Sequence, residues 1–162
     1  MSVTTSRVEA DLGWALGRVT RAHLRTARDV VSDLPGGPRG YQVLAGLGEG
    51  PPSTQLALAR TLGVDRTVMT YLLDELEGEG LVERRPDPAD RRARHVLLTE
   101  TGRARLCDLE RRLRDAEDQL LAPLEPAERD ALRTLLQRLA VRSDGAGSAC
   151  QVAAEIEAGG TC

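Results

Sequence analysis

One stretch of the chain, "QLALARTLGVDRTVMTYLLDEL" from Gln55 to Leu76, constrains the fold more than any other. It predicts two short helices, over residues 55–61 and 66–77, that meet at a steep angle. Ala59 is small enough to lie where the helices touch, and Gly63 tolerates a left-handed turn between them. The apolar anchors beneath both helices are Leu58, Leu62, Val64, Met69 and Leu72. These features indicate a helix-turn-helix, with a plain helical hairpin in a bundle as the alternative.

A β-hairpin is predicted directly after this unit. Residues 81–85 and 93–98 are strand candidates, and the turn-forming segment 86–90 joins them. A β-ribbon in this place makes a winged helix, whose tip can reach a phosphate or a minor groove while the second helix enters the major groove. The tip and its far strand carry Arg91, Arg92 and Arg94. The sequence therefore predicts DNA contact by the wing, and the alternative is a solvated arginine-rich loop.

The charge distribution agrees with an anion-binding surface near the wing. The whole chain has a formal net charge of -3 and contains no lysine. Residues 84–114 hold 10 arginines against 5 acids, a net of +5, whereas residues 1–83 have a net of -3 and residues 115–162 a net of -5. The middle block is therefore the candidate anion-binding surface of an otherwise acidic molecule.

Long amphipathic helices flank the predicted winged helix. A helix is expected over residues 6–33, the Pro- and Gly-containing segment 34–38 ends it, and a short helix over residues 39–48 follows. Thr99 can cap another long helix, and Pro126 fits the first turn of a last one. Each long helix carries one apolar stripe, and three stripes exceed what a small winged helix can cover. We therefore expect a second copy of the chain to bury them.

Other classes of protein find little support in the composition. The chain of 162 residues suits one domain, and no stretch approaches the roughly 18 apolar residues that span a bilayer. Its two histidines and three cysteines show no metal-ligand spacing, so reduced thiols are expected. Neither a nucleophile elbow nor a glycine-rich phosphate loop is present. We expect a cytoplasmic protein that is not an enzyme and binds no metal, cofactor or membrane.

The segment "LGVDRTVMTYLLDELEGEGLVERRPDPADRRARHVLLTETG", residues 62–102, resembles the signature of MarR-type transcriptional regulators. The likeness covers about residues 6–140 in element order and is closest over residues 53–102. It implies a homodimer whose long helices interlock and whose winged helices straddle a pseudo-palindromic operator on double-stranded DNA, usually to repress transcription. It also implies release from DNA by a small organic effector, often phenolic, that binds between the two regions.

The resemblance also assigns DNA-binding roles. On the recognition helix, predicted over residues 66–77, the contacts are Arg66, Thr67, Thr70 and Tyr71. At the start of the supporting helix, predicted over residues 55–61, they are Ser53, Thr54 and Gln55, and on the wing they are Arg91, Arg92 and Arg94. Asp90 is expected to orient an arginine at the base of the wing. Tyr71 and Glu75 stand where many members have arginine. Tyr71 either contacts a thymine methyl group or a phosphate, or packs against its own helix.

The recognition helix is nearly neutral, because Arg66 is opposed by Asp65, Asp74, Glu75 and Glu77. This acidity motivates an alternative function, a winged-helix protein-interaction module without DNA binding.

Four residues are weighed for a ligand or sensor role. Trp14 either lines a pocket where the first helix meets the DNA-binding region or packs in the dimer. His23 is either a core histidine or a ligand contact, and Tyr41 either packs in the core or borders the same junction. Cys107 lies near several arginines that could lower its pKa, or it is a small apolar filler.

The expected fold is therefore mainly α, a winged helix-turn-helix with long N- and C-terminal dimerisation helices and a small wing of two or three strands. Residues 1–162 form one domain, with dimerisation helices over 6–34 and 100–142, the winged helix over 38–99 and a C-terminal tail over 143–162.

Overall fold

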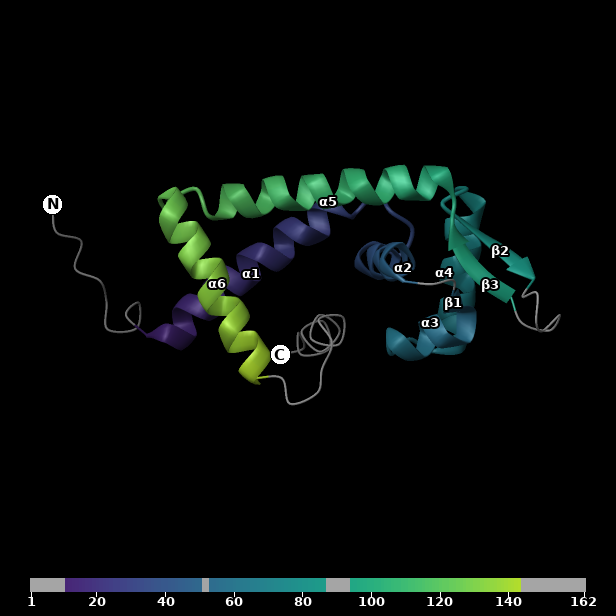
Figure 1. Cartoon of the computed structure of the whole chain (residues 1–162), viewed down its shortest axis with the longest axis horizontal. Helices are drawn as coiled ribbons and strands as arrows, with labels where there is room; N and C mark the ends of the chain where they lie inside the picture. The colour runs from purple at the N-terminus through teal and green to yellow at the C-terminus, as the bar shows by residue number, and fades with distance from the viewer. Residues whose placement is uncertain (1–10, 51–52, 87–93, 144–162) are drawn as a thin grey trace, which may run out of the picture.

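The computed structural model describes residues 11–50, 53–86 and 94–143, and helices dominate this part of the chain (Figure 1). In chain order the elements are α1 (Leu12–Val30), α2 (Pro38–Glu49), β1 (Ser53–Thr54), α3 (Gln55–Thr61), α4 (Arg66–Gly78), β2 (Val82–Pro86), β3 (Arg94–Leu98), α5 (Glu100–Leu120) and α6 (Pro126–Ser143). The mainly helical fold class, with a small antiparallel sheet, is confirmed.

Local signals set most of the helix boundaries. Asp65 caps α4 because its carboxylate accepts hydrogen bonds from the backbone N–H groups of Thr67 and Val68. Gly63 has φ +61° in the turn before it, the left-handed conformation that glycine adopts without steric cost. Pro38, expected to stop the first helix, instead begins α2, where its missing N–H leaves no hydrogen bond unmade.

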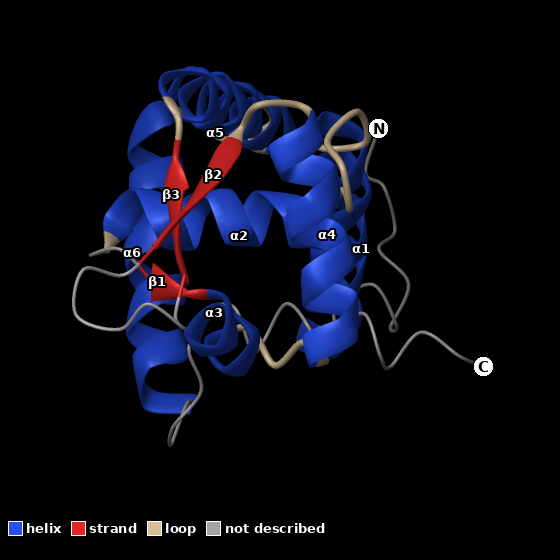
Figure 2. Ribbon diagram, turned by 90° about the vertical axis from the view of Figure 1, so that its right-hand side faces the viewer, coloured by secondary structure: helices blue, strands red, loops and turns tan. Residues whose placement is uncertain are grey.

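The sheet has three antiparallel strands in the order β1-β3-β2 (Figure 2). The predicted hairpin corresponds to β2 and β3, with Val82 opposite Leu98 and Arg84 opposite Val96. A third strand was allowed for in the predicted wing but was not located, since Ser53 and Thr54 were expected at the start of α3. These two residues pair with β3, and the Thr54 side chain also caps α3 by accepting from the N–H of Ala57.

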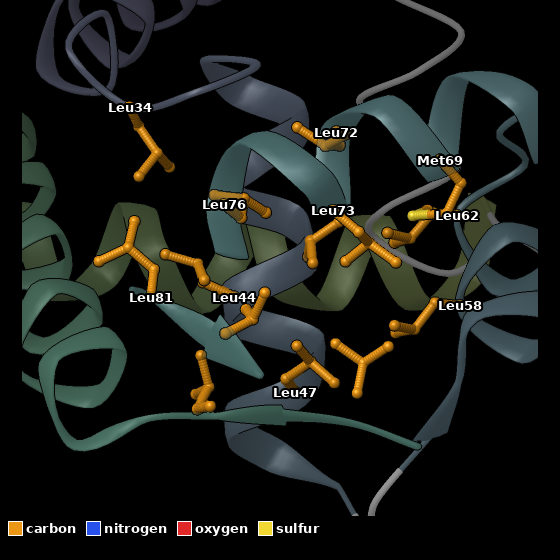
Figure 3. Close-up of a cluster of buried hydrophobic side chains, with 14 of the residues drawn as sticks. Leu34, Leu44, Leu47, Leu58, Leu62, Met69, Leu72, Leu73, Leu76 and Leu81 are labelled. Atoms are coloured by element: carbon orange, nitrogen blue, oxygen red, sulfur yellow. The ribbon is translucent and has the colours of Figure 1, made fainter. Parts of the chain in front are cut away.

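The hydrophobic core lies inside the winged helix rather than among the long helices (Figure 3). α2, α4, the strands and the first half of α5 supply its largest fully buried side chains, which are Val43, Leu44, Met69, Leu73, Leu76, Val82, Val96 and Leu109. All five anchors predicted for the helix-turn-helix are buried, as is Ala59. α1 contributes no buried residue within the helix itself.

A close backbone contact joins α5 to the winged helix. The Thr99 hydroxyl donates to the carbonyl oxygens of Gly80 (2.6 Å) and Leu81 (3.2 Å), and it accepts from the N–H of Gly102. A Cβ atom at Gly102 would lie 1.9 Å from the carbonyl oxygen of Leu81, so only glycine fits there. α5 therefore begins in fixed contact with the end of the α4–β2 turn.

α5 runs from the winged helix to the opposite end of the molecule, where α1 and α6 lie (Figure 1). α1 packs along α5, whereas α6 has few contacts with α1. Large apolar side chains are exposed on both, at Leu12, Trp14, Leu16 and Val19 of α1 and at Leu135, Leu136, Leu139 and Val141 of α6. Within the described residues, none of the helices is both long and apolar enough to cross a membrane.

The first helix is shorter than the expected range of residues 6–33, because Asp11 has an extended backbone and caps α1 before Leu12, and the helix ends at Val30. Residues 6–10 of that range lie outside the described part of the chain. The predicted tail, residues 143–162, falls outside it as well apart from residue 143, the last of α6.

Candidate nucleic-acid interface

The outward face of α4 begins the candidate interface. The core-facing side of α4 consists of Met69, Leu72, Leu73 and Leu76. On the opposite side Arg66, Thr67 and Tyr71 are exposed, as the sequence predicted. Tyr71 is 67% exposed. Val68, which the sequence analysis did not select, is also 48% exposed. Its spacing of three from Tyr71 was a signal that could have found it, because residues i and i+3 share a helix face.

A hydrogen-bonded pair joins the starts of α3 and α4. Gln55 Nε2 donates to Thr70 Oγ1 at 2.6 Å, and Thr70 Oγ1 donates to the carbonyl oxygen of Arg66 at 2.9 Å. Both side chains were predicted as DNA contacts. In the single chain their polar groups are bound to each other across the helix-turn-helix, which fixes the position of α4 on α3.

Most acidic side chains at α4 form hydrogen bonds or ion pairs with other groups of the same chain. Asp65 is the N-cap, and hydrogen bonds from the N–H groups of Thr67 and Val68 lower the pKa of its carboxyl group. Arg84 of β2 lies against the other end of the helix, where its guanidinium contacts Glu77 Oε2 at 2.5 Å and Asp74 Oδ1 at 2.7 Å. Its backbone N–H donates to Glu77 Oε1 at 3.0 Å.

Arg84 therefore has a structural role that the sequence analysis did not assign. Only 14% of its side chain is exposed, so its charge serves the α4–β2 junction rather than the outer surface. The two carboxylates that were expected to oppose Arg66 along the helix are paired with Arg84 instead. Glu75 remains exposed on α4.

The wing is described up to its base. Arg94 is exposed at the start of β3, consistent in position with a surface role. Asp90, Arg91 and Arg92, the other wing residues of the prediction, lie outside the described residues. Ser53 and Thr54 are half-buried in β1, beside β3, so the start of α3 and the inner strand of the wing are neighbours.

The basic block 84–114 is less available to anions than its net charge suggested. Among its described residues, five arginines form ion pairs within the chain, namely Arg84, Arg85, Arg105, Arg111 and Arg112. Arg105 and Arg112 both reach Asp33, in the turn between α1 and α2, at 2.6 and 3.8 Å. Two arginines of α5 thus contribute to the junction between α1, α2 and α5.

Of the three candidate ligand residues, only His23 borders the hollow described between α1 and α5. Trp14 is exposed near the start of α1, where the guanidinium of Arg18 lies 5.6 Å from its ring centre. His23 borders a hollow of about 10 Å³ between α1 and α5, which neither Trp14 nor Tyr41 lines. Tyr41 is half-buried against the core on α2, and burial, followed by nearby glutamates such as Glu110, raises the pKa of its hydroxyl.

Two further expectations concern the sulfur and metal chemistry of the chain. Cys107 is an exposed free thiol, so it does not act as a small apolar filler within the single chain. Within residues 11–50, 53–86 and 94–143, no three His, Cys, Asp or Glu side chains converge as a metal site would require.

Comparison with known proteins points to one family. A family model described as MarR family matches residues 37–93. The transcriptional repressor CouR, solved bound to a 23-mer DNA duplex, is 32% identical over 86% of this chain and 99% of its own, with a TM-score of 0.63. Wild-type MarR of E. coli in its apo form is 28% identical over 80% of this chain and 96% of its own, with a TM-score of 0.65.

A MarR family protein of Mycobacterium tuberculosis in complex with DNA is also similar. It is 28% identical over 80% of this chain and 98% of its own, with a TM-score of 0.67. The similarity extends over the long helices as well as the winged helix, since it covers most of each chain.

Proposed function

The chain belongs to the MarR family of DNA-binding transcriptional regulators, and from this premise we propose that it is a homodimeric repressor of a pseudo-palindromic operator, released by a small organic effector. One observation carries the proposal. The helix-turn-helix presents the exposed face of α4 beside the base of an arginine-bearing wing, in a chain whose relatives have been solved with DNA. The family consists of transcription regulators, so the expectation that the chain is not an enzyme is confirmed.

Exposed apolar side chains support the dimer. They belong to α1 and α6, which lie at the end of the molecule far from the wing (Figure 1), and a single chain leaves them in water. An interface of roughly 2,000 Å² is the size at which obligate dimers begin. A second copy of the same surface would bury both sets of side chains by two-fold symmetry. Light scattering at micromolar concentration should give twice the chain mass, and a stable monomer would contradict the dimer.

Two winged helices on one dimer would address two half-sites. In helix-turn-helix dimers the half-sites lie about 34 Å apart, or one turn of DNA, so the symmetry of the protein predicts the symmetry of the operator. Within each half-site, α4 would enter the major groove, and Arg94 with the wing arginines Arg91 and Arg92 would reach the backbone or the neighbouring minor groove.

Release by an effector requires a difference in affinity between two states of the dimer. The effector must bind more tightly to a dimer whose wing spacing mismatches the operator, because a ligand that binds both states equally shifts nothing. The hollow beside His23 has room for about one water molecule. An organic effector, phenolic compounds being the first class to try, would fit at this place only if the second chain completes the hollow or α1 moves on α5.

A mobility-shift assay tests the DNA part of the proposal. Duplexes enriched from a random library should share a two-fold symmetric motif, and the dimer should bind them at least 1,000-fold more tightly than scrambled duplexes. Affinity should fall steeply as salt rises, because phosphate contacts release counterions. If no motif is enriched, the proposal of sequence-specific binding is rejected.

The alternative, a protein-interaction module that has lost DNA binding, was motivated by the acidic recognition helix. Because Asp74 and Glu77 are paired with Arg84, the helix is less acidic than its sequence suggested, and this weakens the case for the alternative. A flat salt dependence together with no enrichment would favour the interaction module.

A further inference from the structure

We propose that the half-site is read chiefly through thymine methyl groups, with Val68 and Tyr71 of α4 as the specificity-determining residues. The inference rests on the proposed function, since it concerns what α4 recognises in an operator. It assigns a role to Val68 that the sequence pattern did not suggest, and it specifies the chemistry of the DNA site as thymine-containing steps in the major groove.

Exposure is the first observation. Residues 69, 72, 73 and 76 of α4 are buried, yet Val68 is 48% and Tyr71 is 67% exposed. The two side chains are three positions apart and so lie on neighbouring positions of one face. Both belong to the N-terminal half of the helix, the half from which a recognition helix contacts base edges.

The polar groups of the same half-helix are mostly engaged elsewhere. The Thr70 hydroxyl accepts from Gln55 Nε2 and donates to the carbonyl oxygen of Arg66, so neither side chain of that pair is free to present its full set of donors to a base. The acidic Asp65 binds two backbone N–H groups. Arg66 and Thr67 remain exposed in the first turn, where the positive end of the helix dipole favours a phosphate.

An apolar reading surface fits one feature of the major groove. The C5 methyl group of thymine is the apolar group that base pairs present there, and alanine, the threonine methyl group and phenylalanine are typical partners for it. The isopropyl group of Val68 and the ring of Tyr71 offer the same kind of contact. Guanine is normally read by arginine or lysine and adenine by asparagine or glutamine. Between them, Val68 and Tyr71 offer none of these side chains.

The DNA side of the test removes only the methyl group. Starting from the motif enriched by the full-length protein, each thymine of a half-site is replaced by deoxyuridine, which keeps base pairing. Each contacted methyl group should be worth about fourfold in affinity, so two in one half-site should give roughly 15-fold. Thymines outside the half-sites serve as the control and should show no effect.

The protein side identifies which residues make the contacts. Val68→Ala should reduce the thymine–deoxyuridine difference at one position, because the shorter side chain covers less of the methyl group, and Tyr71→Ala should reduce it at another, in double-mutant cycles with the DNA substitutions. Tyr71→Phe should keep the discrimination, because the ring makes the contact. Loss of affinity for both bases alike in Tyr71→Phe would overturn the role of Tyr71 and indicate a hydroxyl–phosphate contact.

The outcomes separate this inference from the function on which it rests. If no motif is enriched, the proposed function fails. If a motif is enriched but deoxyuridine binds as well as thymine at every half-site position, or discrimination persists undiminished in both alanine variants, the inference is wrong while the regulator function stands. Circular dichroism melts of each variant show whether the fold is retained.

Discussion

Arg84 provides a direct test of how the wing and the recognition helix are held together. We expect Arg84→Met to destabilise the protein, because methionine keeps an apolar stem but removes the guanidinium that contacts Glu77 and Asp74. The Arg84 side chain is 14% exposed, so the stem stays packed while the two carboxylates lose their partner.

The size of the loss follows from the exposure of the partners. Hydrogen bonds to charged groups contribute about 1.5–3 kcal/mol each. Asp74 and Glu77 are, however, 56% and 39% exposed, so water replaces much of the lost interaction when the guanidinium is removed. We therefore expect about 2 kcal/mol for both contacts together. For a chain of this size that corresponds to a fall of about 6 °C in Tm.

The assay is thermal unfolding followed by circular dichroism, at one chain concentration because a dimer makes Tm depend on concentration. Arg85→Met is the matched control. Arg85 is the next residue in β2, 65% exposed, and it pairs with Glu83 at 2.6 Å. Arg85→Met should lower the free energy of unfolding by less than about 0.5 kcal/mol. Equal losses for the two variants would refute the reasoning, as would an unchanged Tm for Arg84→Met.

Four further predictions concern other parts of the chain. A Cβ atom at Gly102 would lie 1.9 Å from a backbone carbonyl oxygen, so Gly102→Ala should cost at least about 3 kcal/mol, and a normal melt would contradict the close contact. At Gly46, inside α2, a Cβ meets nothing within 4 Å, so Gly46→Ala should raise stability by about 0.5–1 kcal/mol in the same melts. The hydrogen bond from Arg105 lowers the pKa of the Asp33 carboxyl group in the folded protein. The stability that the ion pair adds is therefore present above the unfolded-state pKa of Asp33 and is lost as pH falls through the lower folded-state pKa. Because Asp33 is 55% exposed, Asp33→Asn should cost less than about 1 kcal/mol at pH 7 and nothing below the folded-state pKa; an equal cost at both pH values would exclude this ion pair as the cause. Arg92→Ala should weaken operator binding by about 1–3 kcal/mol in a mobility-shift titration, and unchanged affinity would remove Arg92 from the interface.

The helix-turn-helix was predictable because its residues carry local signals. Positive φ at Gly63, the cap at Asp65 and the apolar spacing of the anchors each depend on a few neighbouring residues. Such signals can be read without knowing the rest of the fold. The boundaries of α3 and α4 therefore differ from expectation by no more than a residue.

Features that depend on distant partners were not predictable. β1 is two residues long, too short for an alternating pattern, and it exists because Ser53 and Thr54 meet β3 some forty residues later in the chain. Arg84 was counted with the basic wing because it is adjacent to it in sequence. Its direction is determined by β2 lying beside α4, which brings Asp74 and Glu77 within reach.

The close contact between Gly102 and the Leu81 carbonyl makes α5 a lever arm. Because the start of α5 is in close contact with the winged helix, a tilt of the far end of α5 must move the winged helix with it. The 21 residues of α5 span about 31 Å, so a tilt of about 10° displaces the winged helix by roughly 5 Å. That exceeds the rise of about 3.4 Å between successive base pairs. In the proposed dimer, a few degrees of repacking between the subunits are thus enough to carry α4 out of register with its half-site.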